Sequence, residues 1–171
     1  MNYGTIKPTD IANGEGVRVS LFVSGCTHHC PGCFNYVTWD FNYGKPFTKE
    51  TEDEILNLLL RNYIDGLSLL GGEPMEPCNQ RCLVNLVDRF KEKYPNKTLW
   101  IYSGYTYDED LIPGGKAYCE VTDMILDQCD VMIDGEFIES LKDISLKFRG
   151  SSNQRILNIR ETRKRNAIVF W

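Results

Sequence analysis

The sequence predicts an α/β protein with a parallel sheet, folded as a partial (β/α) barrel. Short β-branched or apolar runs alternate with stretches of helical periodicity along most of the chain. Alternation of this kind is typical of parallel strands joined by right-handed helical crossovers. With 171 residues, the chain is too short for a closed eightfold barrel, which takes about 250 residues. We therefore expect a partial barrel or an open, curved sheet.

The amino-terminal half predicts two strands and two helices. Residues 17–23 are β-branched and apolar and form the first expected strand. Residues 51–54 have the form of a capping box and open a helix that ends near Gly66. Residues 67–70 form a second buried strand. A second helix follows, because the apolar side chains between residues 83 and 94 have helical spacing.

The carboxyl-terminal half continues the alternation. Residues 99–102 predict a third strand, residues 118–125 a third helical stretch, and residues 131–133 a fourth strand. Two further strands are expected near the end of the chain, at residues 156–159 and 167–171.

Length and charge limit the classes of function. The chain has the length of one domain, and we expect a single domain over residues 1–171. Its formal net charge of -5 argues against nucleic-acid binding over the whole surface, although residues 155–165 are locally basic. No signal-like amino terminus and no membrane-length apolar window is found. We therefore expect a cytoplasmic protein that binds neither nucleic acid nor membrane.

Three cysteines lie in one loop after the first strand. Cys26, Cys30 and Cys33 are spaced as C-x3-C-x2-C, which suits one compact centre of iron-sulfur, zinc or Cu(I). No fourth cysteine follows nearby, so a cubane cluster would keep one iron open for a reactant. A closed zinc site with His28 or His29 as the fourth ligand is the alternative. Disulfides are disfavoured in the expected compartment.

Turn motifs also follow the other three predicted strands. Residues 71–74 read Gly-Gly-Glu-Pro, residues 103–104 read Ser-Gly, and residues 134–135 read Asp-Gly. Ligands gather at the carboxyl ends of parallel strands, so one pocket is expected to contain all of these motifs. Glu73 offers a carboxylate to an ammonium group or to its own loop. Asp134 either binds ribose hydroxyls or caps the next helix.

With its cysteine loop after the first strand and Gly-Gly-Glu-Pro after the second, the sequence resembles the radical S-adenosylmethionine enzymes. Within that superfamily it is most similar to the activating component of the anaerobic, class III ribonucleotide reductase. The resemblance covers nearly the whole chain. It is carried by residues 13–18, 33–35, 38–40, 72–74, 102–105, 132–135 and 148–155.

The resemblance implies a [4Fe-4S] cluster on Cys26, Cys30 and Cys33, with S-adenosylmethionine chelating the fourth iron. In the family, an electron from a flavodoxin-type donor cleaves this cofactor. The resulting 5'-deoxyadenosyl radical abstracts hydrogen from a glycine loop of the reductase large subunit. No catalytic residue beyond the cluster ligands is implied. The implied cofactor-binding residues are Gly32, Cys33, Phe34, Gly72, Glu73, Pro74, Ser103 and Asp134.

Some features leave alternatives open. Related pyruvate formate-lyase activases have Asp-x-Lys after the fourth strand, whereas here Asp134 is followed by Gly135 and Glu136, so the role of Glu136 stays open. The alternatives are a small radical enzyme acting on another glycyl-radical enzyme or on a nucleotide-like molecule, and a non-catalytic metal module. The aromatic residues 39–43 and the basic tail are expected to border a docking surface. Ordinary reduced thiols are expected at Cys78, Cys82, Cys119 and Cys129.

Overall fold

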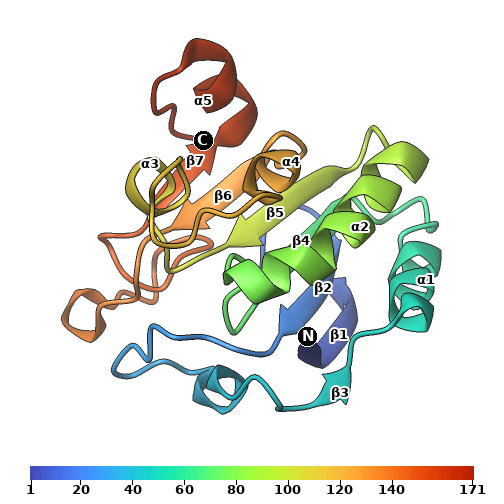
Figure 1. Cartoon of the computed structure of the whole chain (residues 1–171), viewed down its shortest axis with the longest axis horizontal. Coiled ribbons are helices and arrows are strands. Elements are labelled where there is room, and N and C mark those ends of the chain that lie inside the picture. Colours follow the sequence, from blue (N-terminus) through green and yellow to red (C-terminus); the bar gives the residue numbers. More distant parts are fainter.

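The computed structural model describes residues 1–171, which form one seven-stranded sheet with helices packed on it (Figure 1). The strand order is β3-β1-β2-β4-β5-β6-β7. This order places β3 and β7 at the two edges, so the sheet is open and does not close into a barrel. The predicted α/β class is confirmed.

Four neighbouring strands are parallel, as predicted. They are β2 (Arg18–Val23), β4 (Gly66–Gly71), β5 (Thr98–Tyr102) and β6 (Val131–Asp134). Their apolar runs predicted them to within one residue at each end, because strands buried on both faces are almost continuously hydrophobic.

Three antiparallel strands flank this parallel unit. β1 (Asn2–Asp10) pairs with β2, β3 (Lys45–Pro46) pairs with β1, and β7 (Arg155–Asn158) pairs with β6. β7 confirms the strand expected at residues 156–159. The strand expected at residues 167–171 is wrong, since that segment makes one isolated bridge, between Leu157 and Phe170.

The first helix begins and ends earlier than predicted. α1 spans Lys49–Leu58, and its capping box joins Thr48 to Thr51. The expected cap at residues 51–54 therefore lies within the first turn of the helix. The predicted end near Gly66 is also wrong. The backbone N–H of Asp65 donates to Val17 O at 2.7 Å, so the chain already runs beside the start of β2 at that point.

The second helix is confirmed and begins before its apolar stripe. α2 (Pro77–Lys93) has Pro77 in its first turn, where the missing N–H costs nothing. The third helical stretch is confirmed as the short α4 (Thr122–Leu126), and the basic tail forms α5 (Ile159–Arg165), where its cations face the negative end of the helix dipole. The remaining short elements are α3 (Tyr107–Asp110) and the 3-10 turns η1 (Tyr36–Trp39) and η2 (Glu139–Leu141).

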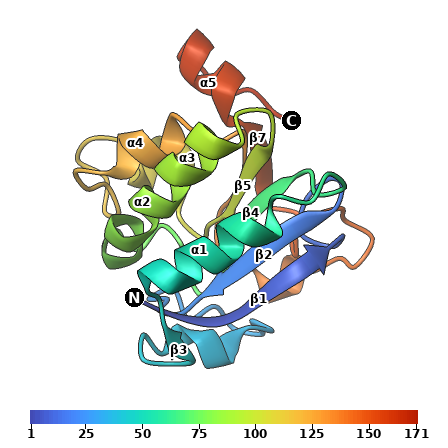
Figure 2. The same ribbon diagram turned by 90° about the vertical axis from the view of Figure 1, so that its right-hand side faces the viewer.

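The two faces of the sheet are covered differently. Figure 2 shows α1, α2 and α4 on one face, where side chains such as Leu21 and Phe90 form the main core. On the other face Trp100 and Ile133 belong to a smaller cluster, packed by Phe148 from a loop. The helical face thus supplies most of the hydrophobic stability, and loops cover the second face.

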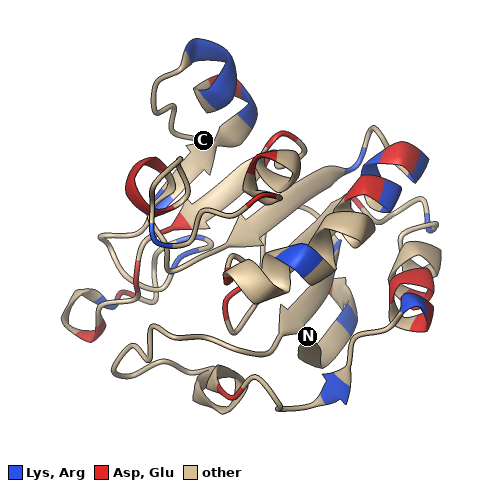
Figure 3. Ribbon diagram, in the orientation of Figure 1, with Lys and Arg blue, Asp and Glu red and all other residues tan.

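Charged side chains are unevenly distributed. In Figure 3, Lys and Arg gather on α5, while Asp and Glu mark α1 and α3. None of the helices is both long enough and apolar enough to cross a membrane.

Candidate functional site

Four loops meet at the carboxyl ends of the parallel strands and line one cavity of about 400 Å³. This volume lies within the range of small-molecule sites. The prediction that these loops share a pocket is therefore confirmed. The loop residues that line it include Cys26, Cys30, Gly32, Cys33, Phe34, Gly72, Glu73, Ser103, Gly104 and Gly135.

The three clustered cysteines all line this cavity. Cys26 is buried, and Cys30 and Cys33 are partly buried. No three His, Cys, Asp or Glu side chains are arranged as ligands of a single ion. Burial, with the charge of Glu73, raises the pKa of Cys26 to about 12, and burial raises the pKa of Cys30. These two thiols are therefore protonated in the metal-free chain, and metal binding must displace the protons and draw the sulfurs together.

The cysteine loop is anchored by the segment that follows it. The N–H groups of Gly25 and Cys26 donate to the carbonyls of Thr38 and Trp39, at 2.8 and 3.1 Å. Gly25 has φ +97°, and a Cβ there would lie 2.2 Å from the Phe41 ring. A glycine is therefore required at this position.

The first turn of α2 anchors the same loop from the other side. Glu76 Oε1 accepts from the N–H and the hydroxyl of Thr27, at 2.8 and 2.6 Å. Asn79 Nδ2 donates to the carbonyls of Ser24 and Glu73, at 3.0 and 2.9 Å. Sequence reasoning missed both residues. Their place directly after Gly-Gly-Glu-Pro is the signal that could have pointed to them.

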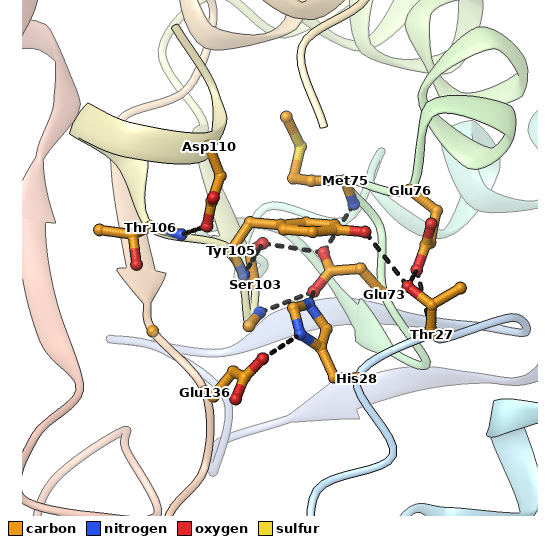
Figure 4. Close-up of polar contacts among 12 residues, drawn as sticks. Thr27, His28, Glu73, Met75, Glu76, Ser103, Tyr105, Thr106, Asp110 and Glu136 are labelled. Atoms are coloured by element: carbon orange, nitrogen blue, oxygen red, sulfur yellow. Dashed lines mark hydrogen bonds and ion pairs between the residues drawn. The ribbon is translucent and has the colours of Figure 1, made fainter. Parts of the chain in front are cut away.

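The Glu73 carboxylate joins two of the strand-end loops (Figure 4). Oε1 accepts from the Met75 N–H and the Ser103 hydroxyl, both at 2.8 Å, and Oε2 accepts from the Gly104 N–H at 2.6 Å. The residue is 1% exposed. Of the two roles considered for Glu73, the structure favours the bond to its own loop over an ammonium ligand.

His28 lies between two carboxylates in Figure 4. Its Nδ1 is 2.8 Å from Glu136 Oε1, and its Nε2 is at ion-pair distance, 3.2 Å, from Glu73 Oε2. Burial lowers the pKa of His28, but the two carboxylates outweigh burial and raise it to about 9. The ring packs on Tyr105 and covers Gly104, where a Cβ would lie 2.7 Å from it. Both ring nitrogens thus have carboxylate neighbours, and the residue lines the same cavity as the cysteines.

His29 points elsewhere. Its ring stacks on Trp39 with centroids 4.7 Å apart, and it lines a separate hollow instead of the cavity. His28 lines the cavity but is held between two carboxylates, so the cavity has three thiols and no free imidazole. The donor set therefore fits a three-thiolate centre better than the closed zinc site.

Two residues that were expected to contact the cofactor do not line the cavity. Asp134 is fully buried, accepts from Arg155 Nε at 2.9 Å and from the Tyr107 N–H at 2.8 Å, and does not line the cavity. Its carboxylate is thus used by the protein, and we revise the expected ribose contact. Pro74 does not line the cavity either.

Gly72 lines the cavity, but the reason for a glycine there differs from the expected one. A Cβ would meet the carbonyl oxygens of Gly25 and Thr38 at 2.6 and 2.8 Å. The packing of the cysteine loop therefore by itself requires a glycine at this position.

Two residues that line the cavity, His28 and Tyr102, each have a buried polar atom without a hydrogen bond, Nε2 and the hydroxyl respectively. A buried hydroxyl of this kind calls for a ligand or water to bond it. Three thiols and a cavity of about 400 Å³ fit a metal cluster with an attached small molecule.

Comparisons with known proteins agree with this site. Residues 12–157 match a family described as "4Fe-4S single cluster domain". The Escherichia coli (strain K12) protein named "Anaerobic ribonucleoside-triphosphate reductase-activating protein" is 46% identical over 94% of this chain and 100% of its own length. Proteins of the same name from Vibrio cholerae and Enterobacteria phage T4 are 42% and 40% identical, each over 91% of this chain and over 97% and 93% of their own lengths.

Proposed function

The chain belongs to the family of anaerobic ribonucleoside-triphosphate reductase-activating proteins, and on this premise we propose that it generates a glycyl radical on an anaerobic ribonucleotide reductase. The reaction is reductive cleavage of S-adenosylmethionine at a [4Fe-4S] cluster. The observation that supports it best is the three-thiol cavity at the strand ends.

Cys26, Cys30 and Cys33 would hold the cluster as thiolates. The engagement of His28 and the outward stacking of His29 support a fourth iron that stays open for the cofactor. When bound, the cluster supplies the electron that splits S-adenosylmethionine into methionine and a 5'-deoxyadenosyl radical. The chain's own residues fix the loops and shape the cavity. In this reading the open sheet is a partial barrel of the radical S-adenosylmethionine type.

The cofactor would lie in the cavity among Gly32, Phe34, Gly72 and Ser103, all of which line it. The carboxylates of Glu73 and Asp134 would act indirectly, by fixing the loops that carry these residues.

The substrate would be a glycine loop of the reductase large subunit. At the cavity, Phe34 is 83% exposed and Ile144 95% exposed, so apolar side chains flank it and leave it accessible to a peptide. A flavodoxin-type protein is the proposed electron donor.

Deuterium transfer tests this function directly. The reductase, labelled with α-deuterated glycine, is mixed anaerobically with the cluster-loaded protein, S-adenosylmethionine and a reductant. Deuterium is expected in 5'-deoxyadenosine, and a glycyl radical signal is expected on the reductase by electron paramagnetic resonance. A Cys30→Ala variant is the control and should give neither. Cofactor cleavage without label or signal would favour the alternative, a small-molecule substrate.

A further inference from the structure

Residues 142–150 form a loop that makes one wall of the cavity. Seven of these nine residues line the cavity, among them Ile144, Phe148 and Arg149. None of the nine belongs to a helix or a named strand, and only Lys142 makes an isolated bridge, to Ser151. Secondary structure therefore does not fix the position of this wall.

The hydrogen bonds of the loop close it on itself. The Asp143 N–H donates to Gly150 O at 3.3 Å, and the Gly150 N–H donates to Gln154 Oε1 at 2.8 Å. Arg149 Nη1 donates to Gln154 O at 2.6 Å. No hydrogen bond joins residues 143–150 to a residue outside the range 143–154. The attachment of the loop to the sheet therefore depends on apolar side chains.

Phe148 attaches the loop through an aromatic cluster. Its ring lies edge-on to Trp100 of β5, with centroids 5.2 Å apart, and edge-on to Trp171, with centroids 6.0 Å apart. The rings of Trp100 and Trp171 also meet, at 5.1 Å, so that each of the three contacts the other two. Trp100 is 2% exposed and belongs to the sheet, so it is the fixed member of the cluster.

The backbone of Phe148 shows that this cluster holds the loop under constraint. Phe148 has φ +59°, in the left-handed region that bulky residues rarely adopt. Such a conformation persists only where the surrounding structure enforces it. The rings of Trp100 and Trp171 are the aromatic contacts that hold Phe148 there.

The position of Trp171 does not depend on its own side chain. Its N–H donates to Ile156 O at 3.0 Å, and the Asn158 N–H donates to Val169 O at 2.9 Å. These backbone bonds hold residues 169–171 beside β7. Substitution of the Trp171 side chain should therefore leave the path of this segment intact.

We propose that Trp171 is a positioning residue for the cavity, which locks Phe148 against Trp100 and thereby holds residues 142–150 as a wall of the S-adenosylmethionine site. The inference rests on the proposed function for the identity of the ligand. An edge-on pair of aromatic rings stabilises a structure beyond the area that it buries, by a factor of about five in an equilibrium. Loss of the Phe148–Trp171 pair should raise the open fraction of the loop by this factor.

Limited trypsin digestion of the iron-free protein measures this opening. Lys147 is an exposed residue of the loop, and cleavage after it requires the loop to open locally. Its rate is divided by the rate of cleavage after Lys91, within α2, which corrects for general unfolding. Trp171→Ala should raise this ratio about fivefold. Phe170→Ala is the matched control and should leave the ratio unchanged, because Phe170 is 66% exposed and lies outside the aromatic cluster.

Two further variants test whether Trp171 acts through Phe148. Trp171→Phe keeps an aromatic ring and should return the ratio toward the wild-type value. In a Phe148→Ala protein, the additional change Trp171→Ala should have no further effect on the ratio, since the loop then has no ring for Trp171 to hold. An unchanged ratio in Trp171→Ala, or additive effects of the two alanine changes, would overturn the inference.

Protection by the ligand tests whether the loop is a wall of the ligand site. S-adenosylmethionine is added without reductant to the reconstituted protein, at about ten times its dissociation constant. Cleavage after Lys147 should become about tenfold slower, as expected for a ligand that binds only while the loop is closed. Unchanged cleavage of a protein that does bind S-adenosylmethionine would overturn the inference. A wild-type protein that binds none would instead overturn the proposed function, and digestion of the iron-free variants would still test the role of Trp171.

Discussion

Replacing Glu73 by alanine is expected to destabilise the iron-free protein by about 3–5 kcal/mol. The carboxylate accepts hydrogen bonds from the Met75 N–H, the Ser103 hydroxyl and the Gly104 N–H. It also faces His28, and only 1% of Glu73 is exposed. Each buried donor left without a partner costs about 1–3 kcal/mol, and such costs within one network are not additive. The loss of the whole network should therefore resemble the breaking of a buried ion pair.

Anaerobic urea unfolding, followed by tryptophan fluorescence and extrapolated to zero denaturant, measures this loss. Glu92→Ala is the matched control, because Glu92 is an exposed residue on α2 and its removal should change stability by less than about 0.5 kcal/mol. If Glu73→Ala unfolds within about 1 kcal/mol of wild type but loses affinity for S-adenosylmethionine, the carboxylate serves the cofactor and our interpretation of the loops is wrong.

Other substitutions test the remaining site residues. Cys30→Ala should lose the cluster, whereas Cys78→Ala, at an exposed thiol outside the cavity, should keep its full iron content by iron and sulfide analysis. Gly72→Ala should also lose iron, because its Cβ would displace the Gly25 carbonyl and the loop that begins there; unchanged iron would contradict the packing argument. Asp134→Ala should lower stability by about 3 kcal/mol in urea unfolding while the folded protein keeps its affinity for S-adenosylmethionine, since the carboxylate pairs with the protein.

The part of the fold that could be predicted from the sequence is the set of buried parallel strands, because burial requires apolar side chains there. The parallel strands lie inside the sheet, and their residues are almost uniformly apolar, so their positions could be read from the sequence. The position of β1 could not be read in this way. Its outer side pairs only with the two residues of β3, and the strand carries exposed polar side chains and Pro8. The register of such a strand is set by its partner rather than by its own pattern.

The three clustered cysteines of the site could be found from the sequence, whereas the residues that hold their loop in place could not. Cys26 to Cys33 form one local motif, whose spacing alone suggests the chemistry. The partners of His28 are distant in the sequence, with Glu136 lying 108 residues away, and no local pattern relates them. Asp134 illustrates the same limit, because a motif position predicts where an acidic residue lies but not that Arg155 pairs with it.

The histidines offer a final test between the open cluster and a closed zinc site. A zinc site with three of the cysteines needs one imidazole as its fourth ligand. His29 is the free candidate, since its ring only stacks on Trp39, whereas His28 is held by two carboxylates. We expect His29→Ala to keep the wild-type iron and sulfide content after anaerobic reconstitution and to bind no zinc in its place. If His29→Ala loses the metal as completely as Cys30→Ala does, the centre has four protein ligands. The position assigned to S-adenosylmethionine would then be filled by the protein itself.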